Sequence, residues 1–593
     1  MRTVLVAGAL LAAPLAAQSP ASVTYTLSVD SASSGVDVIM RVRASAREFR
    51  LAMVAHTEYD DEYWRYVTGL RGESNGTALT ISRADSSEWR VSGPGGDATF
   101  RYHVAFPSAA RGQQEAWKAH LTPTGGLIGG PHSFLYVEGA ERVPLTVDVR
   151  VPAPWRIVTG LDSVAAHQYR ASGIEQLVDS PMLVGAVRRF PFDIAGVPHT
   201  INYLGHPGGA QFDTAALVSR VQQIAHETER MFGSMPYRRY EFLFEDGSYG
   251  GLEHVNSVTI GSNSTNLAAN IDGLLLQIAH EYFHTWNEVH LRPESWIGVR
   301  HTAPQPTGEL WWSEGVTIHY AELILRRAGL HTDDSTRLAR AEAVIASYLS
   351  NPGQSLVSPD AVSRAFNKPA TVTGDYAPSM FTQGEALAIV LDLMIRDGSG
   401  GTRTLDDVMR SLTSRFSIER GFAGSDVEHA VSDACSCNAK PFFDEYVRSA
   451  HPLDFARWLA TIGVTMTATR TRALNRDGTP APDGRLYPIT GADSAILLKV
   501  WSPQTLWGRA GLHTGDRVES LNGQRITDQA TFRRVIGTLR IGDTVRLVVW
   551  RGTERIEKAI VVEGYDRVTV RLERAPGAAP ARRAAFATWA AGR

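Results

Sequence analysis

The chain has 593 residues, of which 43% are hydrophobic and 20% are charged, and its formal net charge at pH 7 is −3. This length exceeds what one hydrophobic core supports, so we expect several folded, soluble domains. A charge so close to zero excludes the long-range field that gathers nucleic acids or anionic lipids, so we expect no nucleic-acid partner.

Residues 1–17 have the pattern of a secretory signal peptide. Arg2 precedes an apolar run that begins at Thr3, and small residues follow as far as Ala17. This order of charge, apolar core and small residues is typical of an export signal that is removed from the mature chain. We therefore expect an exported protein, periplasmic or secreted. No later segment reaches the ~18 unbroken apolar residues of a transmembrane helix.

Hydrophobic periodicity divides the rest of the chain into a multidomain α+β protein. Residues 18–195 carry short alternating segments broken by Gly, Pro, Ser and Asp, which predicts a β-rich domain. Residues 196–465 change to helical periodicity after a short strand, which predicts a mainly helical domain. Strand patterns return at 480–566, after a Pro/Gly/Asp-rich connection. Residues 576–593, rich in Ala, Arg and Pro, have little apolar variety and are expected to form a loose tail.

The two cysteines, Cys435 and Cys437, are separated by one residue. They cannot link distant segments of the chain, and two thiols make a poor zinc site. The sequence leaves open a local disulfide or two free thiols.

The strongest local signal is His280-Glu281-Tyr-Phe-His284, which lies in a run whose apolar residues recur every three or four positions. This spacing predicts a buried helix on which the two imidazoles share one face and converge on one ion, which zinc suits. Glu281 is rotated about 100° from His280, so it stays free to take a proton from water. We expect Glu281 to be the general base.

A third metal ligand is expected at Glu314, thirty positions after His284. A glutamate usually lies on a solvated helix face, but this one is flanked by Trp311, Trp312 and Val316. A carboxylate in so apolar a helix requires a cation. The sequence therefore predicts one Zn²⁺ ion between His280, His284 and Glu314.

Several motif blocks, taken in order, resemble the glycyl aminopeptidase family of gluzincin peptidases. They are the segment 250–254, the H-E-x-x-H helix, the pairs Trp286-Asn287 and Arg292-Pro293, and the Trp-x-x-Glu-Gly-x-Thr segment 311–317. The resemblance implies a β-rich N-terminal domain, a thermolysin-like catalytic domain and a C-terminal PDZ domain. It implies the same zinc ligands and the same base.

The segment Gly250-Gly251-Leu-Glu253-His254 is expected to bind substrate. In related aminopeptidases the glutamate equivalent to Glu253 holds the free α-amino group of a peptide. A Gly-rich edge lets a peptide backbone come close, and Asn256 and Ser257 could add hydrogen bonds. The alternative is a turn with an incidental acidic residue.

One segment departs from the resemblance. Gluzincin aminopeptidases commonly carry Tyr-x-Lys-Gly, whose tyrosine steadies the oxyanion, whereas this chain has Phe381-Thr-Gln-Gly384. Loss of one oxyanion donor costs on the order of a hundred- to a thousandfold in rate. Tyr376 is the candidate replacement, and His319 is a second one that is more typical of a core histidine.

The C-terminal stretches 510–518 and 521–526 resemble PDZ domains of bacterial proteases. Such domains add an extended peptide to a sheet edge and often hold its terminal carboxylate, so peptide or protein C-termini are expected partners. The best placed stretch for that role is 486–490.

Peptides are thus the expected substrates, and an aminopeptidase acting on N-terminal residues, small ones by the resemblance, is the preferred function. Two alternatives stay open from the residues: a zinc endopeptidase with the same centre, and a catalytically weakened peptide-binding envelope protein.

Overall fold

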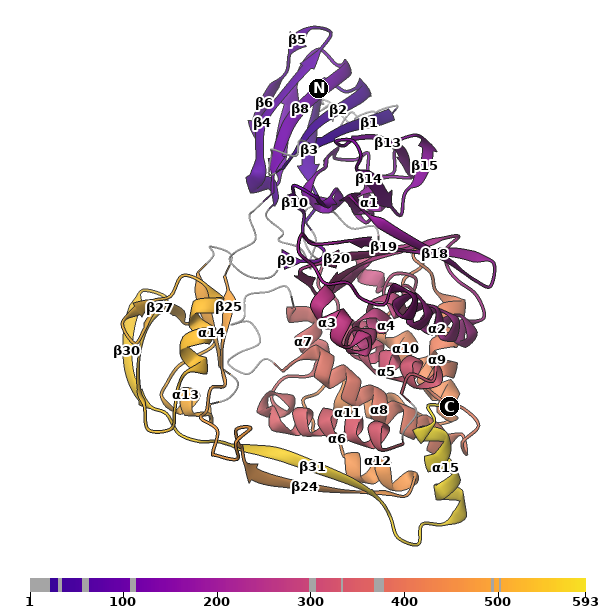
Figure 1. Cartoon of the computed structure of the whole chain (residues 1–593), viewed down its shortest axis with the longest axis vertical. Helices are drawn as coiled ribbons and strands as arrows, with labels where there is room; N and C mark the ends of the chain where they lie inside the picture. The colour runs from indigo at the N-terminus through magenta and orange to yellow at the C-terminus, as the bar shows by residue number, and fades with distance from the viewer. Residues whose placement is uncertain are drawn as a thin grey trace, which may run out of the picture. The chain divides into compact units, whose positions relative to one another are not determined.

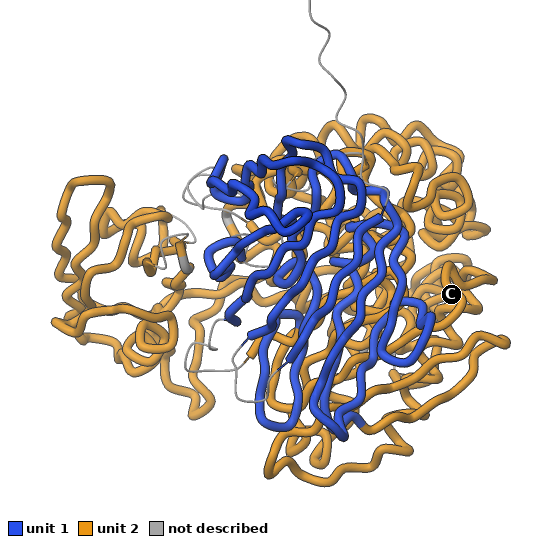
Figure 2. The backbone as a smooth tube through the Cα atoms, turned by 90° about the horizontal axis from the view of Figure 1, so that it is seen from above, with its two compact units in different colours: residues 1–109, 117–187, 301–303 blue, residues 110–116, 188–300, 304–593 orange. Residues whose placement is uncertain are grey.

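The computed structural model describes residues 22–29, 35–55, 63–106, 114–297, 305–331, 334–366, 378–491, 495–500 and 503–593. They form two units, coloured blue and orange in Figure 2: residues 1–109, 117–187 and 301–303, and residues 110–116, 188–300 and 304–593. The expected multidomain α+β fold is confirmed. The expected signal segment, 1–17, lies outside the described residues.

The first unit is built almost entirely of β-strands, as its alternating sequence predicts. In β2, Val36, Val38, Met40 and Val42 are buried while the residues between them are more exposed. Its largest sheet has the order β15 (Asp162–Ala165), β16 (Gln168–Ala171), β13 (Leu145–Arg150), β1 (Ser22–Val29), β2 (Gly35–Ser45), β8 (Gly96–Ala105), β4 (Val67–Ser74) and β5 (Thr77–Ala78). Only β1 and β13 pair in parallel there.

Two four-stranded sheets and three short helices complete this unit. One sheet has the order β10 (His120–Thr122), β11 (Gly125–Ile128), β17 (Met182–Gly185) and β14 (Arg156–Thr159). The other has the order β12 (Leu135–Val137), β3 (Glu48–Met53), β7 (Glu88–Ser92) and β6 (Thr80–Arg83). The helices are η1 (Tyr63–Tyr66), η2 (Gly130–His132) and α1 (Ile174–Val178).

The second unit begins with a sheet whose edge strand is Gly-rich. Its order is β18 (Arg188–Ile194), β19 (Val197–Leu204), β20 (Tyr240–Asp246), β23 (Ser257–Ser262) and β22 (Gly251–Glu253). A separate two-stranded pair joins β21 (Ser248–Tyr249) to β9 (Gln114–Glu115) in parallel. Strand β22 pairs with β23 on one side only, so its other side is an open edge.

The first helix of this unit, Thr214–Phe232, lies between β19 and β20, and the other helices follow the sheet, as expected for the middle of the chain (Figure 1). These helices are α2 (Thr214–Phe232), α3 (Ser264–Ala269), η3 (Ile271–Leu274), α4 (Leu275–Phe283), η4 (Glu294–Trp296), η5 (Trp311–Val316), α5 (Thr317–Arg327), α6 (Asp334–Ser350), η6 (Pro352–Ser355), α7 (Pro359–Ala365), α8 (Met380–Gly398), α9 (Leu405–Arg415), α10 (Gly424–Cys435), α11 (Lys440–Tyr446) and α12 (Phe455–Thr461). Helix α8 is buried along most of its length. Cys435, the last residue of α10, forms a disulfide with Cys437.

The expected loose tail at 576–593 is wrong. Residues Pro580–Ala590 form helix α15, and Phe586 and Trp589 join the main hydrophobic core of the second unit with exposures of 4% and 1%. The Arg337 guanidinium lies 4.7 Å from the Trp589 ring centroid. Two large aromatic side chains three residues apart supply the apolar area that the alanine-rich composition concealed.

A long two-stranded ribbon precedes α15, and its two strands flank the PDZ segment in the sequence. Strands β24 (Val464–Arg472) and β31 (Asp566–Arg574) pair antiparallel over their whole length. Val464, Val570 and Leu572 of this ribbon belong to the same core as the helices, and the Leu572 N–H donates to Glu342 Oε1 of α6 at 2.7 Å.

The PDZ segment lies between the two ribbon strands in sequence and has its own core. Its sheet has the order β25 (Leu486–Thr490), β26 (Ile496–Val500), β27 (Arg517–Leu521), β29 (Thr544–Arg551) and β30 (Glu554–Val561), with β28 (Gln524–Arg525) paired to β27, and its helices are α13 (Leu506–Arg509) and α14 (Gln529–Gly537). Trp507 and Phe532 are fully buried in this core. Among all described residues, no helix is long and apolar enough to cross a membrane.

Candidate metal centre and active site

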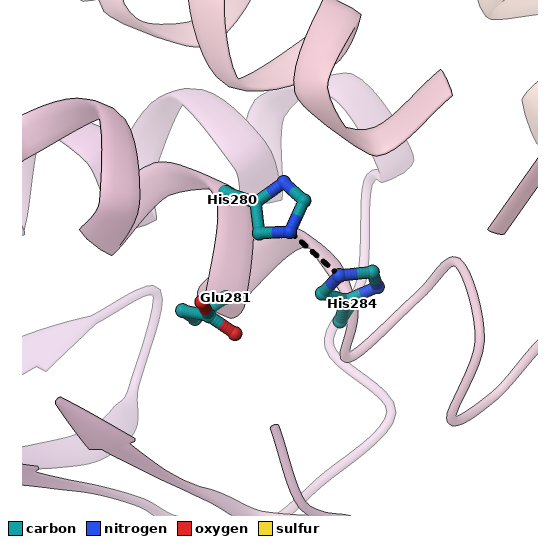
Figure 3. Close-up of side chains that lie close together, drawn as sticks. All are labelled: His280, Glu281 and His284. Atoms are coloured by element: carbon teal, nitrogen blue, oxygen red, sulfur yellow. Dashed lines mark hydrogen bonds between the residues drawn. The ribbon is translucent and has the colours of Figure 1, made fainter. Parts of the chain in front are cut away.

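The H-E-x-x-H segment occupies the end of α4. Leu275, Ile278, Ala279 and Tyr282 are fully buried and hold one face of the helix against the core, as the sequence period predicts. His280 lies in the last turn and His284 is the residue at which the helix ends. Their Nε2 atoms lie 3.0 Å apart, with Glu281 beside them (Figure 3).

Glu314 comes to the same place from a π-helical turn. The six residues of η5, Trp311–Val316, are all buried. Glu314 Oε2 lies 3.4 Å from His280 Nε2 and 3.3 Å from His284 Nε2. A π-turn is rare and occurs most often at functional sites, because it turns a side chain to a position that regular helix cannot give.

Two glycines let α8 lie directly on this π-turn. A Cβ on Gly384 would lie 1.9 Å from the Trp311 carbonyl oxygen, and one on Gly315 would lie 2.3 Å from Gly384 Cα. No other residue type fits at that distance. The Gly of Trp-x-x-Glu-Gly and the Gly of Phe-Thr-Gln-Gly are therefore the two sides of one backbone crossing that fixes the turn carrying Glu314.

These three side chains fit a zinc ion. Donor atoms separated by 3.0, 3.3 and 3.4 Å surround a point roughly 2 Å from each of them, which is the length of a Zn–N or Zn–O bond. Two imidazoles and a carboxylate are also the donor set of many catalytic zinc sites. The set leaves a fourth position for water or substrate.

Charge couples the members of this cluster. Burial would raise the pKa of Glu314, but the nearby His284 and His280 hold it down at about 2. Burial would lower the pKa of His284, yet the carboxylates of Glu253 and Glu314 raise it well above its ordinary value. Burial raises the pKa of Glu281 to about 8, even though His284 opposes the shift. Burial and the neighbouring His284 lower the pKa of His280.

The Gly-rich edge approaches the base. A Cβ on Gly251 would lie 2.7 Å from Glu281 Cδ, so only glycine lets β22 pass this close to the carboxylate. Gly250 has a φ of +74°, a conformation that also favours glycine. Glu253 is half-buried, and its carboxylate, His284 and Glu288 offer ligand atoms within 4.8 Å of one another. The structure thus brings Gly250, Gly251 and Glu253 beside the cluster.

His254, the last residue of the expected substrate-binding segment, follows β22, and Ser257 begins β23. His254 is buried, and its N–H donates to the Ser257 carbonyl at 2.9 Å. Ser257 is fully buried in β23, so its side chain has no exposed surface with which to meet a peptide.

Two functional residues were not predicted from the sequence. Asn287 Nδ2 donates to the carbonyls of Trp312 and Ser313 at 3.1 and 3.2 Å and to Thr317 Oγ1 at 3.0 Å. The backbone carbonyl oxygen of Asn287 lies 3.0 Å from His284 Nδ1, and this contact leaves His284 Nε2 directed at the cluster. One amide therefore joins the end of α4 to the turn that carries Glu314.

The second is Glu288, whose Oε2 lies 3.5 Å from His284 Nδ1. It is buried and has a φ of +131°, which is strained for a residue with a side chain. A backbone strain of this kind is typical of functional sites. No periodicity signals it, because a single left-handed residue leaves the pattern around it unchanged.

Phe381 and His319, two of the three residues considered for stabilisation of the oxyanion, lie among the described residues. Phe381 is partly buried in a small apolar cluster with Leu310, Val362 and Met380. Tyr376 lies outside the described residues. His319 is buried, and burial together with Arg337 lowers its pKa to about 3. The charges that act on His319 belong to a buried ion-pair network of α5, α6 and α8, so it is a core histidine.

A sheet and helices, with an H-E-x-x-H helix and a glutamate oxygen beside both histidines, are the features of a zinc metallopeptidase. The family model described as M61 glycyl aminopeptidase matches residues 274–385, the Peptidase M61 N-terminal domain matches 24–186, and a PDZ domain matches 462–562. The chain therefore matches models of both M61 domains and of a PDZ domain, and the resemblance expected from the sequence is confirmed.

Two solved structures are similar to the chain at low sequence identity. The chain is similar to an aminopeptidase N family protein from Idiomarina loihiensis, with 20% identity, 95% of this chain and 99% of that chain covered, and a TM-score of 0.75. An M1 zinc metallopeptidase from Deinococcus radiodurans has 14% identity, 74% and 96% coverage, and a TM-score of 0.47. The first likeness shows a common fold. No curated protein matches the sequence.

Proposed function

We propose that this zinc metallopeptidase is an aminopeptidase that hydrolyses the first peptide bond of peptides with a free N-terminus. The observation that carries the proposal is the position of Glu253, a half-buried carboxylate on an open strand edge, close to His284 and two residues from the glycine that contacts Glu281. A carboxylate in this position can hold the amino group of a substrate and so place the first peptide bond beside Glu281.

His280, His284 and Glu314 would hold one zinc ion, and the convergence of their donor atoms supports this assignment. Bound zinc would polarise the scissile carbonyl and lower the pKa of water. Glu281 takes a proton from the attacking water as the water oxygen bonds to the carbonyl carbon. Glu281 then passes that proton to the leaving nitrogen as the C–N bond breaks.

The oxyanion donor is assigned to Tyr376, because Phe381 has no hydroxyl. The substitution Tyr376→Phe should lower kcat by roughly a hundredfold with little change in zinc content. The family description favours a small first residue, glycine. The PDZ domain would capture the C-terminus of a peptide at β25, the edge strand of its sheet.

Acetylation of the substrate tests the proposal. A peptide with a free amino group should be cleaved after its first residue, and its acetylated form should be left intact. Glu253→Gln should lose most of the activity with zinc retained, because the amide carries no charge to pair with the amino group. Cleavage of the acetylated peptide at an internal bond would instead identify an endopeptidase.

Residues 1–17 form the signal of an exported enzyme, periplasmic or secreted, in this proposal. The charge, apolar core and small-residue order of that segment supports export. The N-terminal residue of the protein recovered outside the cytoplasm tests it, and an uncleaved Met1 there would contradict it.

A further inference from the structure

A pocket of about 440 Å³ lies where the Gly-rich edge meets the start of the metal-binding helix. It is lined by Tyr249 of β21 and by Gly250 just before β22, by Asn266 and Asn270 from α3 and its end, and by Gln277 from α4. None of the described residues that line it is charged. It is therefore a neutral pocket rich in amide groups.

The pocket lies on the leaving-group side of the scissile bond if the proposed function holds, and the inference rests on that function. Along β22, Glu253 would hold the amino group, and Gly251, two residues before it, contacts the base Glu281. The bond that is attacked then lies opposite Gly251. The next substrate residue lies further in the same direction, toward Gly250 and the pocket.

Gln277 reaches the same place from the helix. It lies four residues before Glu281, so the two side chains are one turn apart on the same face of α4. Its Nε2 atom is buried and has no hydrogen-bond partner among the described residues. A buried amide donor without a partner is unfavourable, so a ligand that supplies an acceptor gains from meeting it.

Strand β9 ends the open edge just beyond this point. It pairs in parallel with β21, and the Ala116 N–H donates to the Tyr249 carbonyl at 3.0 Å. Among the described residues, the backbone edge is thus occupied at Tyr249 and open along β22. The substrate residue that follows the scissile bond is the last one for which this edge has room.

We propose that this pocket is the subsite for the side chain of the second substrate residue, and that Gln277 donates a hydrogen bond to it. Neutral side chains with an acceptor, glutamine and asparagine above all, would be favoured there. Aliphatic side chains would leave the amide unpaired, and charged ones would enter a pocket without a counter-ion.

The peptides Ala-Gln-Ala, Ala-Leu-Ala and Ala-Glu-Ala test this subsite. The wild-type enzyme should have a kcat/KM about tenfold higher for the glutamine peptide than for either of the others, which is the effect of one hydrogen bond to a buried donor. Gln277→Leu should remove or reverse the preference for glutamine over leucine. Gln223→Leu, an exposed position on α2, is the matched control and should leave that ratio unchanged.

Each failure has a separate meaning. If the zinc-loaded enzyme hydrolyses no peptide with a free α-amino group, the proposed aminopeptidase function is wrong. If peptides are hydrolysed with the same glutamine-to-leucine ratio in wild type and Gln277→Leu, only the subsite is wrong. Zinc content and circular dichroism establish that the variant is folded. If it is not, the wild-type series decides, and a flat profile or one that favours leucine overturns the inference.

Discussion

Single residues decide how close the parts of the site can come. A Cβ at Gly251 would overlap the Glu281 side chain at 2.7 Å, so Gly251→Ala must displace the base or the strand. Because a shift of about 1 Å costs roughly a hundredfold in rate, we expect kcat/KM to fall at least tenfold with zinc retained. Gly205→Ala, whose Cβ would meet no atom nearer than 3.9 Å, is the control. Equal activity of the two variants would show that Glu281 does not need this approach.

Asn287 is the second test at the residue scale. Its amide joins the end of α4 to the turn that carries Glu314 through three hydrogen bonds. Asn287→Ala should weaken zinc binding by about 10- to 100-fold, the usual effect of losing a residue that orients a metal ligand. Competition with a chromogenic chelator measures this. An unchanged zinc Kd in a folded variant would reduce Asn287 to a helix-end residue.

At the scale of elements, the sequence predicted what depends on periodicity. Helix α4 and its three functional residues were predicted because apolar side chains recur every three or four positions over nine residues. The π-turn of η5 was not, because six residues are too few to separate its period from that of an α-helix. The roles of Asn287 and Glu288 depend on partners far away in sequence, which no local pattern reveals.

Helix α15 is the element that composition concealed, and it gives a stability test. Trp589 is 1% exposed in the main core, so Trp589→Ala should lower the free energy of unfolding by about 3–5 kcal/mol. Thr588→Ala, on the exposed side of the same helix, should change it by less than about 1 kcal/mol. Denaturant titration measures both. If Trp589→Ala changes the free energy of unfolding by less than about 1 kcal/mol, residues 576–593 would be a loose tail after all.

Helix α8 supplies a pH test through a buried ion pair. Asp392 Oδ2 lies 2.8 Å from Arg396 Nε. Burial opposes the charge, but the Arg396 guanidinium holds the pKa of Asp392 below its ordinary value of 3.8. A carboxyl with a lowered pKa in the fold stabilises it above pH 3.8, and this contribution is lost as the pH falls through the folded pKa.

Asp392→Asn should therefore be less stable than wild type near pH 6, and the difference should shrink below about pH 4. The free energy of unfolding of both proteins, measured across this range, checks it. A difference that stays constant with pH would mean that Asp392 acts through packing and hydrogen bonds alone.

At the scale of the whole molecule, the PDZ segment is an insertion between two strands of a ribbon that belongs to the helical domain. Sequence patterns predicted its approximate extent, but pairing between residues more than 100 positions apart, as between Val464 and Arg574, has no local signal. Because each part has its own core, replacement of residues 475–563 by a short turn should leave zinc binding and tripeptide hydrolysis intact. Loss of zinc from a soluble deletion variant would contradict this division.

The central claim is a zinc site whose base is Glu281, and the most direct measurement is the activity of Glu281→Gln at known zinc content. The account predicts one zinc per chain in both proteins and a kcat for free-amino peptides that falls by a factor of about 10³ or more in the variant, since the amide cannot take the proton. Equal activity of wild type and Glu281→Gln, with zinc bound in both, would contradict it.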